Sequence, residues 1–158
     1  MSYTIRGLPL ERFAPLFGLD DAALAARGAR RVIADGHGFP CRVSLEDALP
    51  GETLILLNHV SNWCEGPYRT AQAIYVREAA AGAASYVGRT PPVFAGRILS
   101  LRGFTAQGDL ADARLAAPGE HDREIRELLD NPQVDHVDAH NAAPGCFAAC
   151  IERYREAA

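Results

Sequence analysis

Residues 97–115, RILSLRGFTAQGDLADARL, decide the fold expected for this chain. Two strand-like runs, Arg97–Phe104 and Leu110–Leu115, flank the short turn-forming stretch Ala106–Asp109, which contains a glycine. This arrangement predicts a β-hairpin, and it is the clearest hairpin signal in the sequence. We therefore expect antiparallel strand pairing in the second half of the chain.

Five further segments are predicted to be strands on the same grounds: Tyr3–Leu8, Arg30–Asp35, Thr53–His59, Ala73–Arg77 and Val134–His140. The continuous apolar run Thr53–His59 predicts a central strand that is buried on both faces. In Ala73–Arg77, Ile74 and Val76 are expected to point one way while Tyr75 and Arg77 point the other.

Helical spacing is found in three places. After Pro9, apolar residues at 10, 13, 16 and 17 share one face, and Asp20 or Asp21 is a plausible N-cap for a second helix that ends near Gly28. A third helix is predicted over Glu120–Leu129, stopped by Asn131-Pro132. The periodicity of Cys146–Tyr154 does not choose between helix and strand.

These elements predict an α+β fold. We expect a mixed, largely antiparallel sheet, with the N-terminal helices and the helix of residues 119–130 packed on one face. The length of 158 residues suits one domain spanning residues 1–158, and a hydrophobic content of 48% is enough for a core. The net charge of -4 argues against a surface that neutralises phosphates, so no nucleic-acid partner is expected.

The sequence shows neither a signal-peptide pattern at its start nor an apolar stretch long enough to span a bilayer, so we expect a cytoplasmic protein without a membrane partner. Disulfides are rare in that compartment, so the four cysteines are expected to be thiols. No phosphate-binding loop or dinucleotide fingerprint is present, and no cofactor is predicted.

Three segments together resemble a bacterial family known as DUF1203, a domain of unknown function. They are Phe39–Leu45, then Pro67-Tyr68-Arg69 with Ile74–Glu78, and His140–Phe147. The resemblance implies membership of that family across essentially the whole chain, but it implies no activity, cofactor or substrate. Cys41 and Cys146 lie in these segments, whereas Cys64 and Cys150 do not, which makes the first two the stronger functional candidates.

The first candidate site is a thiol site. Arg42 directly follows Cys41, and a neighbouring guanidinium favours a nucleophilic thiolate. Cys146 follows a Pro-Gly turn, with His140 and Asn141 a few residues before it. Cysteine, histidine and asparagine are the residue types of a nucleophile, a base and an orienting group. The competing interpretation is that both thiols are packed in the core.

The second candidate is an anion site formed by Arg42, Arg77 and Arg102, whose guanidinium groups would converge on a carboxylate or phosphate if their strands are neighbours. Tyr68, in a polar loop with Trp63, is a candidate for stacking on a flat ligand. Local ion pairs for the arginines and simple burial for the aromatic rings are the alternatives.

No metal site is predicted. His136 and His140 are placed on a strand, where a rise of about 3.3 Å per residue separates them by roughly 13 Å, too far to share an ion. A distributed site of His37, Cys41, His59 and Cys64 stays open as an alternative.

Two functional classes follow from these residues. In one, the protein binds a small anionic molecule through its arginines beside a thiol, and an enzymatic version uses His140 as general acid or base with Asn141 orienting it or binding an oxyanion. In the other, the same residues only close turns in a scaffold or protein-interaction domain. The first class requires the Cys41-Arg42 corner and the His140–Cys146 corner to share one accessible cavity. Whether the protein is an enzyme, and its oligomeric state, are left open.

Overall fold

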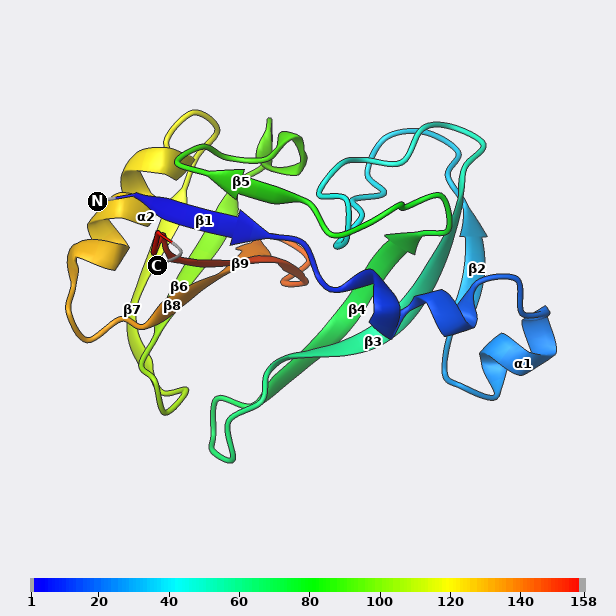
Figure 1. Cartoon of the computed structure of the whole chain (residues 1–158), viewed down its shortest axis with the longest axis horizontal. Coiled ribbons are helices and arrows are strands. Elements are labelled where there is room, and N and C mark those ends of the chain that lie inside the picture. The colour runs from blue at the N-terminus through cyan, green and yellow to red at the C-terminus, as the bar shows by residue number, and fades with distance from the viewer. Residues whose placement is uncertain (1, 157–158) are drawn as a thin grey trace.

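The computed structural model describes residues 2–156, which form two antiparallel sheets set at an angle to each other (Figure 1). The larger sheet has six strands in the order β5-β1-β9-β8-β6-β7, and the smaller has three in the order β2-β3-β4. The larger sheet consists of β1 (Tyr3–Arg6), β5 (Ser85–Val87), β6 (Leu99–Phe104), β7 (Leu110–Ala116), β8 (His136–Asn141) and β9 (Phe147–Arg153). The smaller sheet consists of β2 (Arg30–Ile33), β3 (Thr53–Asn62) and β4 (Thr70–Arg77).

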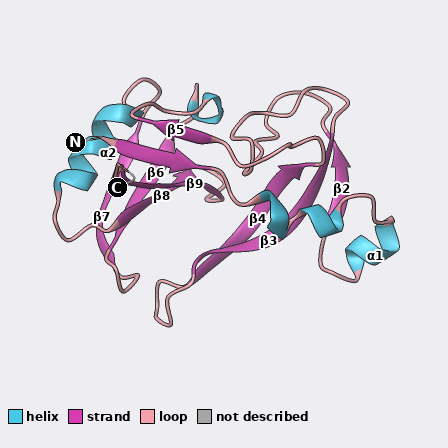
Figure 2. Ribbon diagram, in the orientation of Figure 1, coloured by secondary structure: helices cyan, strands magenta, loops and turns pink. Residues whose placement is uncertain are grey.

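Helices are few and short. They are α1 (Asp21–Ala25), α2 (His121–Asp130) and three 3-10 turns at Leu10–Arg12, Ala14–Leu16 and Pro92–Phe94. Figure 2 shows α2 against the larger sheet and α1 beside the smaller one. The predicted α+β class is confirmed. Within residues 2–156, no helix combines the length and hydrophobicity that a bilayer span requires.

The arrangement of the helices differs from the expected single face. Helix α2 contacts β6, β7, β8 and β9, whereas α1 contacts β2 in the other sheet. Helix α2 connects β7 and β8 of the larger sheet, whereas α1 directly precedes β2 of the smaller one, and each packs beside these neighbours in sequence. The strands likewise divide between two sheets instead of forming one, and every strand pair between the named strands is antiparallel.

The hairpin predicted from residues 97–115 is present as β6 and β7, paired from Leu99 and Ala116 to Phe104 and Leu110. Strand β8 pairs with β6 on one side and β9 on the other. The undecided segment that begins at Cys146 therefore contains a strand, β9. Its neighbour on the far side is β1, so the two ends of the chain lie in one sheet.

The main core lies between α2 and the larger sheet. Ile125, Leu128 and Leu129 of α2 are buried against the strands, as their spacing predicted, and Leu101 and Val137 face them from β6 and β8. Each such side chain contributes about 1.5–3 kcal/mol through burial. This core fixes the larger sheet as a rigid support.

In the smaller sheet, β3 is the central strand, but it is not buried throughout. Leu54 and Ile55 are fully buried, whereas Leu56 is only partly covered. Leu56 pairs with Tyr75 on β4, and both side chains line a pocket between the two sheets. The apolar run that predicted two-sided burial thus also supplies a pocket wall.

The N-terminal segment packs on the smaller sheet. Asp20 caps α1 by accepting a hydrogen bond from the Ala23 amide at 2.8 Å, and Gly28 follows the helix with a φ of +67°, as predicted. The helix expected after Pro9 is instead a pair of 3-10 turns. Pro15 has no amide hydrogen to donate and sits at the start of the second turn, which limits regular α-helical bonding there.

The tips of two hairpins join the sheets at one end. Asn62, at the end of β3, donates to the Gly108 carbonyl in the β6–β7 turn at 3.0 Å. Gly108 has a φ of +86°, and a Cβ placed on it would lie 2.3 Å from Cys64 Cβ. Only glycine fits this contact without displacement.

Candidate functional site

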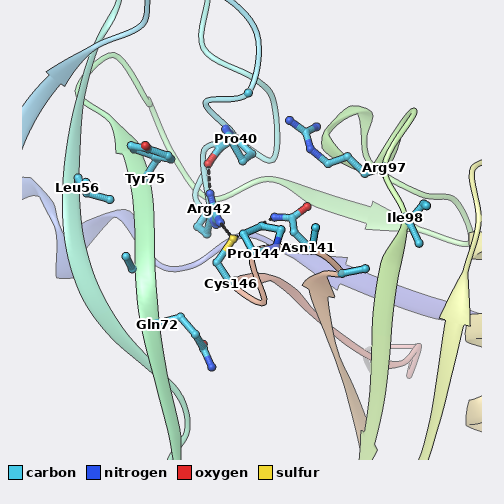
Figure 3. Close-up of a pocket in the computed structure, with 14 residues that line it drawn as sticks. Pro40, Arg42, Leu56, Gln72, Tyr75, Arg97, Ile98, Asn141, Pro144 and Cys146 are labelled. Carbon is cyan, nitrogen blue, oxygen red and sulfur yellow. Dashed lines mark hydrogen bonds between the residues drawn. The ribbon is translucent and has the colours of Figure 1, made fainter.

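A pocket of about 680 Å³ lies between the two sheets (Figure 3). Its lining comes from segments far apart in the chain: Gly38, Pro40, Arg42, Leu56, Gln72, Ala73, Tyr75, Arg97, Ile98, Asn141, Ala142, Ala143, Pro144 and Cys146. The volume is in the range of pockets that hold small organic molecules.

The walls are largely apolar, and three polar side chains meet in one place, apart from Gln72 and Arg97. Leu56 and Tyr75 come from the smaller sheet, and Ile98 and Pro144 come from segments that adjoin strands of the larger one (Figure 3). Between these walls lie the side chains of Arg42, Asn141 and Cys146, which point toward one another. An apolar enclosure with a few convergent polar groups is typical of a small-molecule site.

Arg42 reaches the pocket from a short segment attached to the edge of β4. Cys41 forms an isolated parallel bridge with Tyr75, and the Arg42 amide donates to the Tyr75 carbonyl at 3.1 Å. The chain then turns, with the Leu45 amide donating to the Cys41 carbonyl at 3.1 Å. Leu45 is fully buried with a φ of +53°, a conformation uncommon for a side-chain-bearing residue, so the surrounding packing must hold this turn.

Cys146 is presented by the tight turn between β8 and β9. The Gly145 amide donates to the Asn141 carbonyl at 2.8 Å, and the Asn141 amide donates to the Cys146 carbonyl at 2.9 Å. Gly145 has a φ of +76°, which glycine adopts without strain. The Pro144-Gly145 signal in the sequence thus predicted the turn that places the thiol.

The Arg42 guanidinium lies beneath the pocket, and the residue is 2% exposed. Its Nε donates to the Phe147 carbonyl at 2.7 Å, and Nη1 donates to the Pro40 carbonyl. Its Nη2 donates to Cys146 Sγ at 3.2 Å. Within residues 2–156, no carboxylate lies at ion-pair distance from Arg42. Burial lowers the pKa of Arg42, and nearby Cys146 opposes that effect.

Cys146 Sγ accepts a second hydrogen bond, from Asn141 Nδ2 at 3.3 Å. The sulfur thus accepts from two side-chain donors, a guanidinium and an amide. Arg42 Nη2 and Asn141 Nδ2 each carry two N–H groups and use one of them on the sulfur. The remaining N–H of each is therefore available to an oxygen atom placed beside Cys146.

Cys41, the other predicted thiol, lies close behind Arg42 but outside the pocket lining. It is fully buried, and its sulfur accepts backbone amide hydrogen bonds from Val43 at 3.4 Å, Ser44 at 3.4 Å and Arg77 at 3.3 Å. These contacts tie the Cys41–Leu45 turn to β4. The two predicted corners of the chain are thus brought together, with Cys146 in the pocket and Cys41 sealed behind it.

His140 is not among the residues that line the pocket. It is fully buried, and burial lowers its pKa to about 4. Its Nδ1 lies 3.0 Å from the Gly145 carbonyl, which can only accept, so the neutral ring carries its proton on Nδ1. Its Nε2 is buried without a hydrogen-bond partner. The imidazole holds the turn that carries the thiol.

Two more titratable groups lie on the same side of the ribbon as His140. Asp138 pairs with Cys150 across β8 and β9, and their side chains are hydrogen-bonded. Burial raises the pKa of Asp138 to about 6 and raises the pKa of the Cys150 thiol well above its usual range. We call Asp138, His140 and Cys150 the buried cluster. None of its members lines the pocket.

The other predicted ligand-binding residues do not reach the pocket. Arg77 is paired with Glu52 at 2.6 Å and with Glu46 at 3.2 Å. Arg102 lies on β6, where its Nε donates to Ser100 Oγ at 3.4 Å. Tyr68 is exposed in the loop between β3 and β4. The structure therefore brings Arg42 to the pocket without Arg77 or Arg102.

No three His, Cys, Asp or Glu side chains in the described part of the chain are close enough to hold a metal ion together. His136 instead stacks on Phe104, with ring centroids 5.7 Å apart. The buried ring of His59 contacts Phe147, at 5.5 Å, in the space between the sheets.

Several lining residues carry no local signal in the sequence. Leu56 and Ile98 read as ordinary strand residues, and they become pocket walls only because the two sheets face each other. At the rim, Arg97 is held by Asp47 through two hydrogen bonds of 2.9 and 2.6 Å. That pair joins residues fifty positions apart, which single-residue patterns do not predict.

A family model described as "Protein of unknown function (DUF1203)" matches residues 38–153, most of the chain. The protein therefore belongs to this family, in agreement with the three sequence segments that resembled it. The matched range contains every residue that lines the pocket. Neither the curated proteins nor the solved structures contain a match to this chain.

Proposed function

We propose that the protein binds a small, largely apolar molecule between its two sheets and acts on it with the Cys146 thiolate as nucleophile. The observation that carries this proposal is the double hydrogen bond to Cys146 Sγ, from Arg42 and from Asn141, inside an open pocket. Thiolates stabilised by a cation and accessible to small molecules are typical of reactive cysteines.

The buried guanidinium is best explained by an anionic partner. Removing a cation from water costs several kcal/mol unless hydrogen bonds and an opposite charge compensate it. Two carbonyl oxygens provide hydrogen bonds to Arg42 but no net charge. A Cys146 thiolate provides that charge, so the arginine and the thiol support each other.

Of the predicted anion site, we retain only the part formed by Arg42. Of the three predicted arginines, only Arg42 lines the pocket, and much of its hydrogen-bonding capacity is used within the protein. The charge of Arg97 at the rim is matched by Asp47. We therefore expect the ligand to place one polar or anionic oxygen near Arg42 and Asn141, with an apolar body against Leu56 and Tyr75.

A free thiolate of this kind persists in a reducing compartment, so the proposal includes a cytoplasmic location. His140 is assigned a positioning role, since its protonated nitrogen faces Gly145 and its other nitrogen is enclosed. Cys41 is assigned a structural role on the basis of its three amide contacts.

The test is the rate of alkylation of each cysteine in the native protein. Limiting iodoacetamide is added, samples are quenched over time, and peptide mapping by mass spectrometry gives the rate at each thiol. We expect Cys146 to react faster than Cys64, a partly exposed thiol off the pocket, because Arg42 donates to the sulfur of Cys146. Equal or slower labelling of Cys146 would contradict the proposed nucleophile and favour the scaffold interpretation.

A further inference from the structure

Resting on the proposed function, we infer that Cys146 reduces organic hydroperoxides, becoming a sulfenate that a small soluble thiol then reduces. The inference rests on the donors and apolar side chains that lie beside the thiol in the pocket, and on the lack of a base among the described lining residues. It specifies the substrate class of the same site.

The first observation is the lack of a base. Among the described residues that line the pocket, none is Asp, Glu or His. The nearest imidazole by sequence, His140, is engaged with the Gly145 carbonyl and does not line the pocket. Hydrolysis through an acylated thiol needs a base to activate the water that releases the acyl group. The pocket is therefore poorly equipped for hydrolytic turnover.

Hydroperoxide reduction needs no base once the thiolate exists. The sulfur lone pair attacks the terminal oxygen of ROOH, the S–O bond forms and the O–O bond breaks. The bonding pair leaves with the RO oxygen, which takes the hydroxyl proton and departs as the alcohol ROH. Cys146 becomes a sulfenate, oxidised by two electrons, and the peroxide is reduced by two.

The second observation is the supply of donors beside the sulfur. Arg42 Nη2 and Asn141 Nδ2 each retain one N–H after binding Sγ. Those two N–H groups are placed to bind the peroxide oxygens during attack and the sulfenate oxygen afterwards. Donors fixed where negative charge develops lower the barrier because they need no reorganisation.

The third observation concerns the body of the substrate. Leu56, Tyr75, Ile98 and Pro144 enclose an apolar space far larger than hydrogen peroxide needs. Burying apolar groups of the substrate there adds binding that hydrogen peroxide cannot obtain. An alkyl or aryl hydroperoxide is therefore the expected substrate.

The thiolate is restored from outside the protein. Cys146 is the sole cysteine on the pocket lining within residues 2–156, so no second thiol is in position to form a disulfide there. Two molecules of a small thiol R'SH complete the cycle. The first forms a mixed disulfide and releases the oxygen as water, and the second displaces Cys146 as R'SSR' forms.

The experiment mixes reduced protein with cumene hydroperoxide or hydrogen peroxide in the presence of dimedone, which traps sulfenic acids. We expect the dimedone adduct on Cys146, a rate with cumene hydroperoxide at least about tenfold above that with hydrogen peroxide, and repeated turnover with dithiothreitol. Cys146→Ser, and wild-type protein blocked at Cys146 with iodoacetamide, should both lose peroxide consumption. Cys64→Ser is the matched control and should keep it.

The outcomes separate the two proposals. Fast alkylation of Cys146 without sulfenate, or with peroxide rates no higher than those of free cysteine, would overturn the hydroperoxide inference and leave the nucleophilic pocket standing. Slow alkylation together with slow peroxide reduction would remove both.

Discussion

The two sides of the β8–β9 ribbon carry different chemistry. The buried cluster on one side has an acid, an imidazole and a thiol, the residue types of a catalytic triad, yet burial keeps the Cys150 thiol protonated and the His140 ring neutral. The pocket side carries Asn141 and Cys146 with Arg42 beside them, and none of the described residues that line the pocket is Asp, Glu or His. Its sulfur is nevertheless the one that accepts two side-chain hydrogen bonds beside an open cavity.

The comparison shows that environment decides reactivity more than residue type does. Burial raises the pKa of the Cys150 thiol, and the neighbouring Asp138 carboxyl raises it further. For Asp138 itself, burial outweighs the hydrogen bond from Cys150, so its pKa is also raised. A thiol next to a buried guanidinium is in the setting typical of reactive cysteines, and it is the one that we propose as the nucleophile. A choice based only on cysteine, histidine and aspartate would have favoured the buried cluster instead.

The largest expected effect is on which thiol reacts. Cys146→Ala should abolish the fast phase of iodoacetamide labelling, because it removes the thiol that lines the pocket. Cys150→Ala should leave that phase unchanged, because Cys150 is held protonated. Stopped-flow or quenched labelling with mass detection measures both variants. A fast phase that survives in Cys146→Ala would show that a thiol other than Cys146 is the reactive one.

The second-largest expected effect is that of removing the Arg42 guanidinium. Arg42→Gln deletes the charged donor on Cys146 and should slow alkylation at that residue by roughly 10- to 100-fold, the range expected for a charge-assisted hydrogen bond. Arg77→Gln is the matched control, since Arg77 pairs with Glu46 and Glu52 off the pocket. Circular dichroism checks that each variant is folded, and an unchanged rate in folded Arg42→Gln would contradict the role given to the guanidinium.

The buried cluster is probed by the pH dependence of stability. The pKa of Asp138 is raised to about 6 from 3.8, so its contribution to stability is greatest below pH 3.8 and is lost as the pH rises through 6. Asp138→Asn should therefore gain on the order of 2–3 kcal/mol relative to wild type across this interval.

His140 and His59, whose pKa values are lowered to about 4, contribute in the opposite direction, with stability rising between pH 4 and 6.5. The free energy of unfolding is measured by urea titration at several pH values between 4 and 7. The slope of this free energy against pH is then compared between Asp138→Asn and wild type. Parallel slopes would show that Asp138 is not held in the strongly desolvated state described here.

The smallest expected effect is that of the amide donor. Asn141→Ala should slow alkylation of Cys146 by about 2- to 10-fold, in keeping with the loss of one neutral hydrogen bond. Gln133→Ala, which removes an exposed amide outside the pocket lining, is the control and should leave the rate unchanged. An effect as large as that of Arg42→Gln would show that the amide, rather than the cation, dominates.

Local signals in the sequence predicted most elements of the fold. The spacing of Ile125, Leu128 and Leu129, the stop at Asn131-Pro132 and the turn at Pro144-Gly145 all act over a few residues, and the structure has each of them. The division into two sheets was not predicted, because strand partners are chosen by packing between distant segments. Pro15 likewise converted an expected helix into short turns.

The site was predicted only in part, because local signals mark single residues but not the contacts between distant segments. The sequence marked Arg42, Asn141 and Cys146 as candidates because they lie at turns rich in Gly and Pro, and these three meet. It also marked Arg77 and Arg102, whose partners turned out to be neighbouring side chains. The contact between Arg42 and Phe147 spans 105 positions, and no local pattern encodes such a distance.

The contact between Asn62 and Gly108 has a consequence for ligand selection. It fastens the far ends of β3 and the β6–β7 hairpin, so the two sheets are tied at their tips as well as at Arg42. A slot fixed at both places keeps its width whether empty or filled. Molecular thickness, more than length, should then decide which compounds enter, and molecules with a single ring or a chain should be admitted ahead of wider ones.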